Sequence, residues 1–180
     1  MSKIYYHVVT ERPMELNQGI IFDDNHHSGV FERIYKEKDL VDKVYSNNEV
    51  ELTDNLKKAL REFALEDVRE NEFSNYPSRL SCLYVSKSLK EAEFWYNLFI
   101  DLGRPTFQIV KVEVDGREFT GDAWNVFEGT TDIDNNKELA KRYWLNLDNN
   151  QGKEPILETI VDGKIKVIEI VKIHEVDYEK

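Results

Sequence analysis

The sequence predicts a single α+β domain in which antiparallel strands are flanked by helices. Runs of β-branched and aromatic residues lie at both ends of the chain and near its centre, and amphipathic stretches with capping residues lie between them. Two dipeptides, Asp115-Gly116 and Asp162-Gly163, each stand between alternating apolar runs, which is the pattern of a two-residue hairpin turn. With 180 residues, of which 41% are hydrophobic, the chain can bury a substantial core as one domain.

Composition restricts the classes of partner. The formal net charge of -11 argues against nonspecific binding to nucleic acid or to an anionic membrane, since both polymers are negative. No apolar run approaches the ~18 to 20 residues of a membrane helix, and the first residues lack the apolar region of a signal peptide, so we expect a cytoplasmic protein. The single cysteine, Cys82, lies in an apolar strand and is expected to be a small buried hydrophobe.

The first strand is expected over residues 4–10, where every residue except His7 is β-branched or aromatic. A histidine in the middle of a strand is by default half-buried and hydrogen-bonded. A turn near Gly19 leads into a short strand over residues 20–22.

A polar loop follows over residues 23–29 and contains His26 and His27. Adjacent histidines project in different directions, and no Cys/His quartet or HExxH spacing accompanies them. We therefore expect no metal site.

Two helical regions are expected next. Residues 30–48 have the spacing of a short helix or two. Thr53 then caps a longer helix that reaches about Asn71, because a threonine hydroxyl accepts a hydrogen bond from a free amide of the first turn. The apolar stripe of this helix should face the core; it comprises Leu56, Ala59, Leu60, Phe63, Ala64 and Val68.

At the centre of the chain a strand leads directly into a capped helix. Residues 80–85 are expected to form the strand, and Ser88 with Glu91 has the spacing of a capping box. Gly103 ends the helix. One face of this helix is apolar and carries Leu89, Ala92, Tyr96 and Phe99, with Trp95 beside them. Polar groups at such a corner can bind a ligand, although a capped helix after a buried strand has the same pattern.

The remaining elements alternate strand, helix and strand. Residues 107–114 and 117–120 are expected to pair as a hairpin on the first Asp-Gly turn, and residues 156–161 and 164–171 as a hairpin on the second. Loops are expected at 121–136 and 146–154, on either side of a helix over 137–145. Glu158 is a carboxylate in a mostly apolar strand, where it lies either at a solvated edge or in a cleft with a partner.

Three short stretches resemble one enzyme superfamily. They are His7 on the first strand, Tyr84 followed by Ser86-Lys87-Ser88 at the central corner, and Glu158 followed by Thr-Ile-Val on a late strand. In this order they resemble the ADP-ribosyltransferases of the His-Tyr-Glu type, which include diphtheria-type toxins and poly-ADP-ribose polymerases. The resemblance implies a split antiparallel β-sheet core with flanking helices, in one domain over residues 1–180.

The same resemblance implies chemistry on nicotinamide adenine dinucleotide (NAD), used as a substrate. Glu158 would stabilise positive charge on the ribose as the bond to nicotinamide breaks. Tyr84 would stack on the nicotinamide ring, and His7 would bond to a ribose hydroxyl. These three residues are the catalytic candidates.

Further residues would contact NAD on the same basis. The backbone of Val8 would hold the nicotinamide amide, where polymerases have glycine, and Arg79 would meet the pyrophosphate. Ser86 and Ser88 would lie at the start of the helix. Either Trp95 or Tyr96 would supply a second stacking aromatic ring.

Nearly all of the 180 residues also resemble a bacterial and phage-associated family of unknown function that is grouped with ADP-ribosyltransferase folds; the resemblance includes Tyr5-Tyr6-His7 near the start and the stretch at 76–86. Three alternatives for function remain open: an active transferase or NAD glycohydrolase, an RNA 2'-phosphotransferase-like enzyme, and a catalytically silent module that binds a nucleotide or a protein. The acceptor of ADP-ribose could be a protein side chain, a nucleic acid, a small molecule or water, although the acidic charge disfavours a nucleic acid. A nucleic-acid or membrane partner is not expected.

Overall fold

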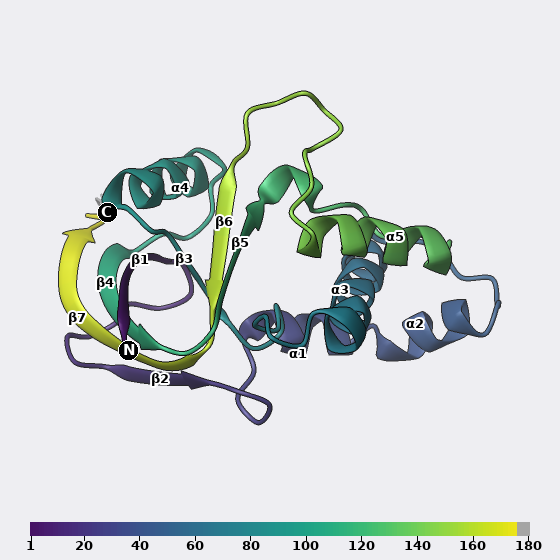
Figure 1. Ribbon diagram of the computed structural model, residues 1–180, viewed down its shortest axis with the longest axis horizontal. Helices are drawn as coiled ribbons and strands as arrows, with labels where there is room; N and C mark the ends of the chain where they lie inside the picture. The colour runs from purple at the N-terminus through teal and green to yellow at the C-terminus, as the bar shows by residue number, and fades with distance from the viewer. Residues whose placement is uncertain (176–180) are drawn as a thin grey trace, which may run out of the picture.

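The computed structural model describes residues 1–175, which form two antiparallel sheets and five α-helices (Figure 1). The helices are α1 (Gly29–Tyr35), α2 (Lys38–Tyr45), α3 (Asp54–Glu72), α4 (Leu89–Asp101) and α5 (Ile133–Trp144), with a short 3-10 turn, η1 (Ala123–Asn125). The strands are β1 (Lys3–Val9), β2 (Gly19–Phe22), β3 (Leu83–Val85), β4 (Gln108–Asp115), β5 (Glu118–Asp122), β6 (Leu157–Val161) and β7 (Gly163–Ile173). The α+β class is therefore confirmed.

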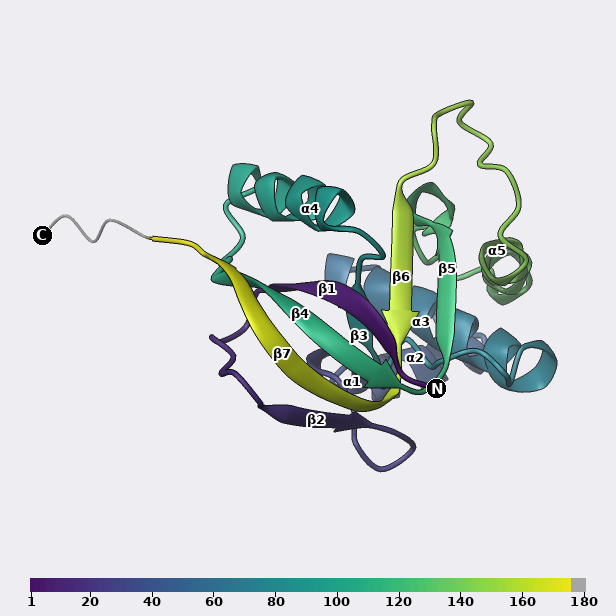
Figure 2. The same ribbon diagram turned by 60° about the vertical axis from the view of Figure 1, so that its left-hand side comes forward.

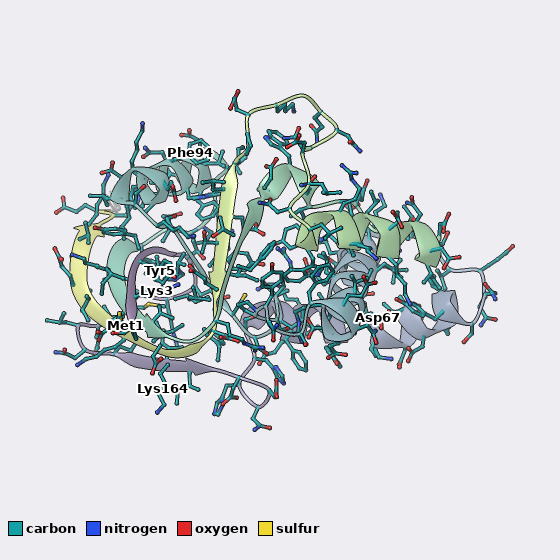
Figure 3. All side chains as sticks on the ribbon, in the orientation of Figure 1. Met1, Lys3, Tyr5, Asp67, Phe94 and Lys164 are labelled. Carbon is teal, nitrogen blue, oxygen red and sulfur yellow. The ribbon has the colours of Figure 1, made fainter. Side chains whose placement is uncertain are left out.

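The larger sheet has the strand order β1-β4-β7-β2 and the smaller one β3-β6-β5. The two sheets meet where β1 approaches β3, because Tyr6 and Ser86 exchange backbone hydrogen bonds of 2.9 and 2.7 Å. A second link joins β1 to β5, where the Tyr5 hydroxyl and the Lys3 ammonium both donate to the Glu118 carboxylate at 2.5 Å. Figure 3 labels Lys3 and Tyr5 on β1. Apolar side chains from both sheets fill the space between them; this core includes Tyr5, Val9, Val85, Val112, Val161 and Val167.

The two predicted hairpins are wrong, because neither Asp-Gly pair joins paired strands. Strand β4 pairs with β1 and β7, whereas β5 pairs with β6 in the other sheet. The chain therefore forms a two-stranded ribbon that runs from one sheet into the other and bends at the two Asp-Gly sites. The bends touch each other: a Cβ atom on Gly116 would lie 1.9 Å from the Asp162 carbonyl oxygen. Asp162 also accepts hydrogen bonds from the backbone and the guanidinium of Arg117, which fixes the bend.

The predicted helix starts at Thr53 and Ser88 are confirmed. The Thr53 hydroxyl accepts from the amide of Leu56, and the Ser88 hydroxyl accepts from the amide of Glu91. The Glu91 carboxylate accepts from the amide of Lys87, one residue earlier than a capping box requires.

Two element boundaries differ from prediction. Helix α5 begins at Ile133 and not near Lys137, because the Asp132 side chain caps it by accepting from the amide of Asn135. The central strand begins at Leu83, because the preceding residues form a turn in which the Ser78 carbonyl accepts from the amide of Ser81.

The helices cover different sheets. Helix α4 packs on β1 and β4 of the larger sheet, through Ala92 and Tyr96 against Val8 and Ile109 (Figure 2). Helices α3 and α5 cover one face of the smaller sheet, with Ile160 of β6 in that core. Within residues 1–175, none of the helices has the length and apolar character needed to cross a bilayer.

Candidate functional site

Arg79 lies in the turn before β3 and is the centre of a buried polar cluster. Its Nε and Nη2 atoms donate to the two oxygens of Glu62, at 3.0 and 3.3 Å. Its Nη1 atom donates to the Tyr143 hydroxyl at 2.8 Å and to Glu158 Oε1 at 2.5 Å. The cluster therefore joins α3, α5 and β6 through one guanidinium.

The charges in this cluster are fixed by their mutual contacts. Burial raises the pKa of the Glu62 carboxyl, but the positive charges of Arg79 and Arg61 outweigh burial and hold that pKa below its usual range. Burial likewise lowers the pKa of Arg79, but the charge of Glu62 outweighs it, and the pKa lies well above its usual value. Burial raises the pKa of the Tyr143 phenol, so this group stays neutral and donates its proton to Glu158 at 2.8 Å.

Glu158 is held through only one of its two oxygens. Oε1 accepts from both Arg79 and Tyr143, and the side chain keeps 14% of its surface exposed. Within the part of the chain that the structure describes, no side-chain or backbone donor bonds to Oε2, and every buried side-chain polar atom has a partner. Oε2 therefore reaches the surface of the protein, where a ligand hydroxyl could bond to it.

Tyr84 lies beside this cluster on β3. Its register partner on β6 is Ile160, two residues from Glu158, so all three side chains lie on the same face of the smaller sheet. The centre of the Arg79 guanidinium lies 5.6 Å from the centre of the Tyr84 ring, within the range of a cation–π contact. Burial raises the pKa of the Tyr84 phenol well above its usual value, so Tyr84 is neutral.

His7 is joined to Tyr84 through the backbone. The His7 Nδ1–H group donates to the Tyr84 carbonyl oxygen at 2.7 Å. Burial and the nearby charge of Arg104 lower the pKa of His7 to about 4, although the bond to Tyr84 opposes them. The imidazole is therefore neutral near pH 7, with its proton on Nδ1 and Nε2 as an acceptor.

Several expected NAD contacts lie elsewhere or have other partners. Arg79, expected to meet a pyrophosphate, is buried and already bonded to two carboxylates and a phenol, so in this structure it positions Glu158. Ser86 links the sheets through its backbone, and Ser88 caps α4. The side chains of Val8 and Tyr96 lie in the core under α4, where the Tyr96 hydroxyl contacts His174 Nδ1 at 3.0 Å.

Sequence reasoning missed Glu62 and Tyr143. Glu62 is not part of the apolar stripe predicted for its helix, yet it lies three residues after Ala59 and three before Leu65, and both of these are buried. A single carboxylate flanked in this way is the signal that could have identified it. Tyr143 lies within the helix predicted over 137–145; its side chain is buried, and its hydroxyl bonds to Arg79 and Glu158.

The histidine pair in the polar loop has separate partners. His26 Nδ1 bonds to Asp23, and His27 Nδ1 bonds to the Ser81 hydroxyl. Within residues 1–175, no three His, Cys, Asp or Glu side chains are placed to share a metal ion.

Two surface hollows lie on the α3 and α5 side of the protein, with volumes of about 370 and 300 Å³. Neither is lined by His7, Tyr84 or Glu158. The larger one, called the α3 hollow below, is lined by Asp54, Lys57, Lys58, Arg61, Val126, Phe127 and Glu128.

One family model matches residues 5–173, a span that includes every residue of the Arg79 cluster as well as His7 and Tyr84. Its description is "Protein of unknown function (DUF2441)". No curated protein matches the chain.

Proposed function

The chain belongs to the DUF2441 family, and we propose that it is an NAD-dependent ADP-ribosyltransferase in which Glu158 is the catalytic carboxylate. The observation that carries the proposal is the state of this side chain. Oε1 is fixed by Arg79 and Tyr143, whereas Oε2 reaches the surface, on the face of the smaller sheet that also carries Tyr84. A carboxylate held in one orientation with one open oxygen is suited to stabilise a charge that develops at a fixed point.

The chemistry follows from how charge develops. When the bond between nicotinamide and ribose breaks, nicotinamide leaves with the bonding electron pair, and C1 of the ribose becomes positive. Glu158 Oε2 would accept a hydrogen bond from a ribose hydroxyl and lower the energy of that positive state. The acceptor or a water molecule then bonds to C1 and loses its proton.

His7 and Tyr84 would have positioning roles in this reaction. The neutral His7 ring presents Nε2 as an acceptor for a second ribose hydroxyl, because its Nδ1–H group is already bonded to Tyr84. The half-buried ring of Tyr84 would stack on nicotinamide.

The test is to incubate the protein with NAD and to measure free nicotinamide. Glu158→Gln should lower the rate of release by at least ~10²-fold, the scale for removing one preorganised electrostatic group. Glu154→Gln, at an exposed position shortly before β6, is the matched control and should leave the rate unchanged. Equal rates for the Glu158 variant and the wild type would remove Glu158 from the mechanism.

One observation favours a second candidate, a catalytically silent module. Arg79 lies against Glu158 and offsets part of its negative charge, which weakens the stabilisation that Glu158 could give to a cation. Binding of NAD without release of nicotinamide, in the presence of candidate acceptors, would support this candidate. The RNA 2'-phosphotransferase alternative is disfavoured by the net charge of -11.

A further inference from the structure

The α3 hollow gathers positive charge on an acidic protein. Lys57, Lys58 and Arg61 line it, although the whole chain has a formal net charge of -11. Its two carboxylates, Asp54 and Glu128, both pair with Lys57, at 3.7 and 3.0 Å. Among the ion pairs within residues 1–175, Lys58 has none, and the single partner of Arg61 is the buried Glu62. Lys58 and Arg61 therefore leave positive charge facing the hollow.

Residues 126–128 form the second wall of the hollow, and the backbone of Gly129 holds them close to α3. Residue 129 lies so near α3 that a Cβ atom on Gly129 would be 2.2 Å from the Lys57 carbonyl oxygen and 2.7 Å from the Arg61 nitrogen. Only glycine allows this approach. The preceding residues, Val126 and Phe127, form an apolar surface beside the cations.

A ladder of alternating charges connects the hollow with Glu158. Arg61 donates to Glu62 Oε1 at 3.0 Å, Glu62 accepts from Arg79 at 3.0 Å, and Arg79 donates to Glu158 at 2.5 Å. The two inner side chains, Glu62 and Arg79, are 2% and 6% exposed, whereas Arg61 and Glu158 at the ends are 22% and 14% exposed. The ladder thus passes through the core and reaches the surface at both ends.

We propose that the α3 hollow binds a phosphate-bearing small molecule through Lys58 and Arg61, and that the ladder transmits its binding to Glu158. The cations suit a phosphate group, and the ring of Phe127 offers a surface for a nucleobase. This site is separate from the proposed NAD site, and its test does not depend on NAD chemistry.

The coupling has a direct physical cause. A bound phosphate competes with Glu62 for the guanidinium of Arg61. Glu62 Oε1 also accepts from Arg79 Nη2, at 3.3 Å. When its hydrogen bond from Arg61 weakens, Glu62 therefore attracts Arg79 more strongly and draws it closer. Because Arg79 holds Glu158 at its opposite side, the contact between Arg79 and Glu158 loosens.

The experiment is a titration with inorganic pyrophosphate, ADP or adenosine, followed by the side-chain Nε–H signals of Arg61 and Arg79 in nitrogen-15 NMR spectra. We expect both signals to shift along one saturating curve with pyrophosphate and with ADP. Equal affinities would identify the phosphate group itself as the ligand, and tighter binding of ADP would identify a nucleotide. Shifts that never saturate, or adenosine binding as tightly as ADP, would overturn the site.

Matched variants separate the site from its coupling. Lys58→Glu changes an exposed side chain and should weaken binding at least about tenfold, whereas Lys164→Glu on β7, also exposed, should not (Figure 3 labels Lys164). Wild-type affinity in the Lys58 variant would overturn the site.

Arg61→Lys tests the coupling. It keeps the charge but loses the two-pronged guanidinium that bonds Glu62, so the Arg79 signal should no longer shift. A persisting Arg79 shift would overturn the ladder. Glu158→Gln should retain the Arg61 shift, which distinguishes this site from one at Glu158.

Discussion

Arg79 Nη1 donates to Glu158 Oε1 at 2.5 Å, and the opposite side of the same guanidinium bonds to Glu62. One buried cation thus serves two carboxylates from different elements. Without Arg79, Glu158 would lose its cation, and the 2% exposed Glu62 would keep only Arg61; a buried charge that loses its partner is costly. The relationship makes Arg79 a stability determinant as well as the group that orients Glu158.

We therefore predict a large loss of stability for Arg79→Met. The free energy of unfolding should fall by about 3–5 kcal/mol, the scale for removing one partner of a buried ion pair. Urea denaturation at pH 7 measures this change. Arg12→Gln, at an exposed position, is the control and should stay within ~0.5 kcal/mol of the wild type. A loss below about 1 kcal/mol for Arg79→Met would show that the cluster relaxes without its cation.

His7 should make stability depend on pH. Its pKa in the folded protein is about 4, below the ordinary value of 6.5, so as pH falls the unfolded chain takes up the proton first. The contribution of neutral His7 to the free energy of unfolding is fully present above pH ~6.5 and is lost as the pH falls toward 4. It should make the free energy of unfolding about 1–2 kcal/mol lower at pH 5 than at pH 7.

The measurement is urea denaturation of the wild type and of His7→Asn at both pH values. Asparagine can still donate to the Tyr84 carbonyl but does not titrate, so the variant should lack this part of the pH dependence. Equal pH dependence in the two proteins would contradict the assignment.

The bend at Gly116 should tolerate no side chain. A Cβ atom there would lie 1.9 Å from the Asp162 carbonyl oxygen, so Gly116→Ala must displace the backbone of the second bend. We expect the free energy of unfolding to fall by about 2–4 kcal/mol. Gly19→Ala is the matched control, because nothing lies within 4 Å of its added methyl group. Similar stabilities of the two variants would show that the ribbon absorbs the change.

The thiol of Cys82 should be unreactive in the folded protein. The side chain is buried, and burial raises the pKa of its thiol. A chromogenic disulfide reagent should label it in denaturant but only very slowly at pH 8 without denaturant. Rapid labelling of the folded protein would show that the turn before β3 opens easily.

Local patterns in the sequence predicted most elements, and long-range pairing explains the main errors. The caps at Thr53 and Ser88 were identified because a cap and its helix are adjacent in sequence. The Asp-Gly turns were misassigned because an Asp-Gly pair between strands has the same sequence pattern whether the chain reverses or bends. Only the pairing of β4 with β7, and of β5 with β6, decides between them.

The candidate site stays a prediction, but the structure shows where its residues lie. Tyr84 and Glu158 lie on one face of the smaller sheet, and His7 donates to the Tyr84 carbonyl. Glu62 and Tyr143 come from helices distant in sequence, and nothing near them in the chain shows that they meet Arg79. Contacts between residues that are distant in sequence leave little trace in the sequence pattern around each residue.

The strand order of the larger sheet also determines when this protein can fold. Tyr5 pairs with Val112, and Gly19 pairs with Lys166, so both N-terminal strands must wait for partners that are synthesised much later. Strand β7 lies between β4 and β2 and is the last of the strands within residues 1–175 to be synthesised. A nascent chain that ends before Gly163 contains every strand of the smaller sheet, but in the larger sheet β2 has no partner and β4 pairs only with β1. Folding should therefore be slow, as expected when pairings are distant in sequence.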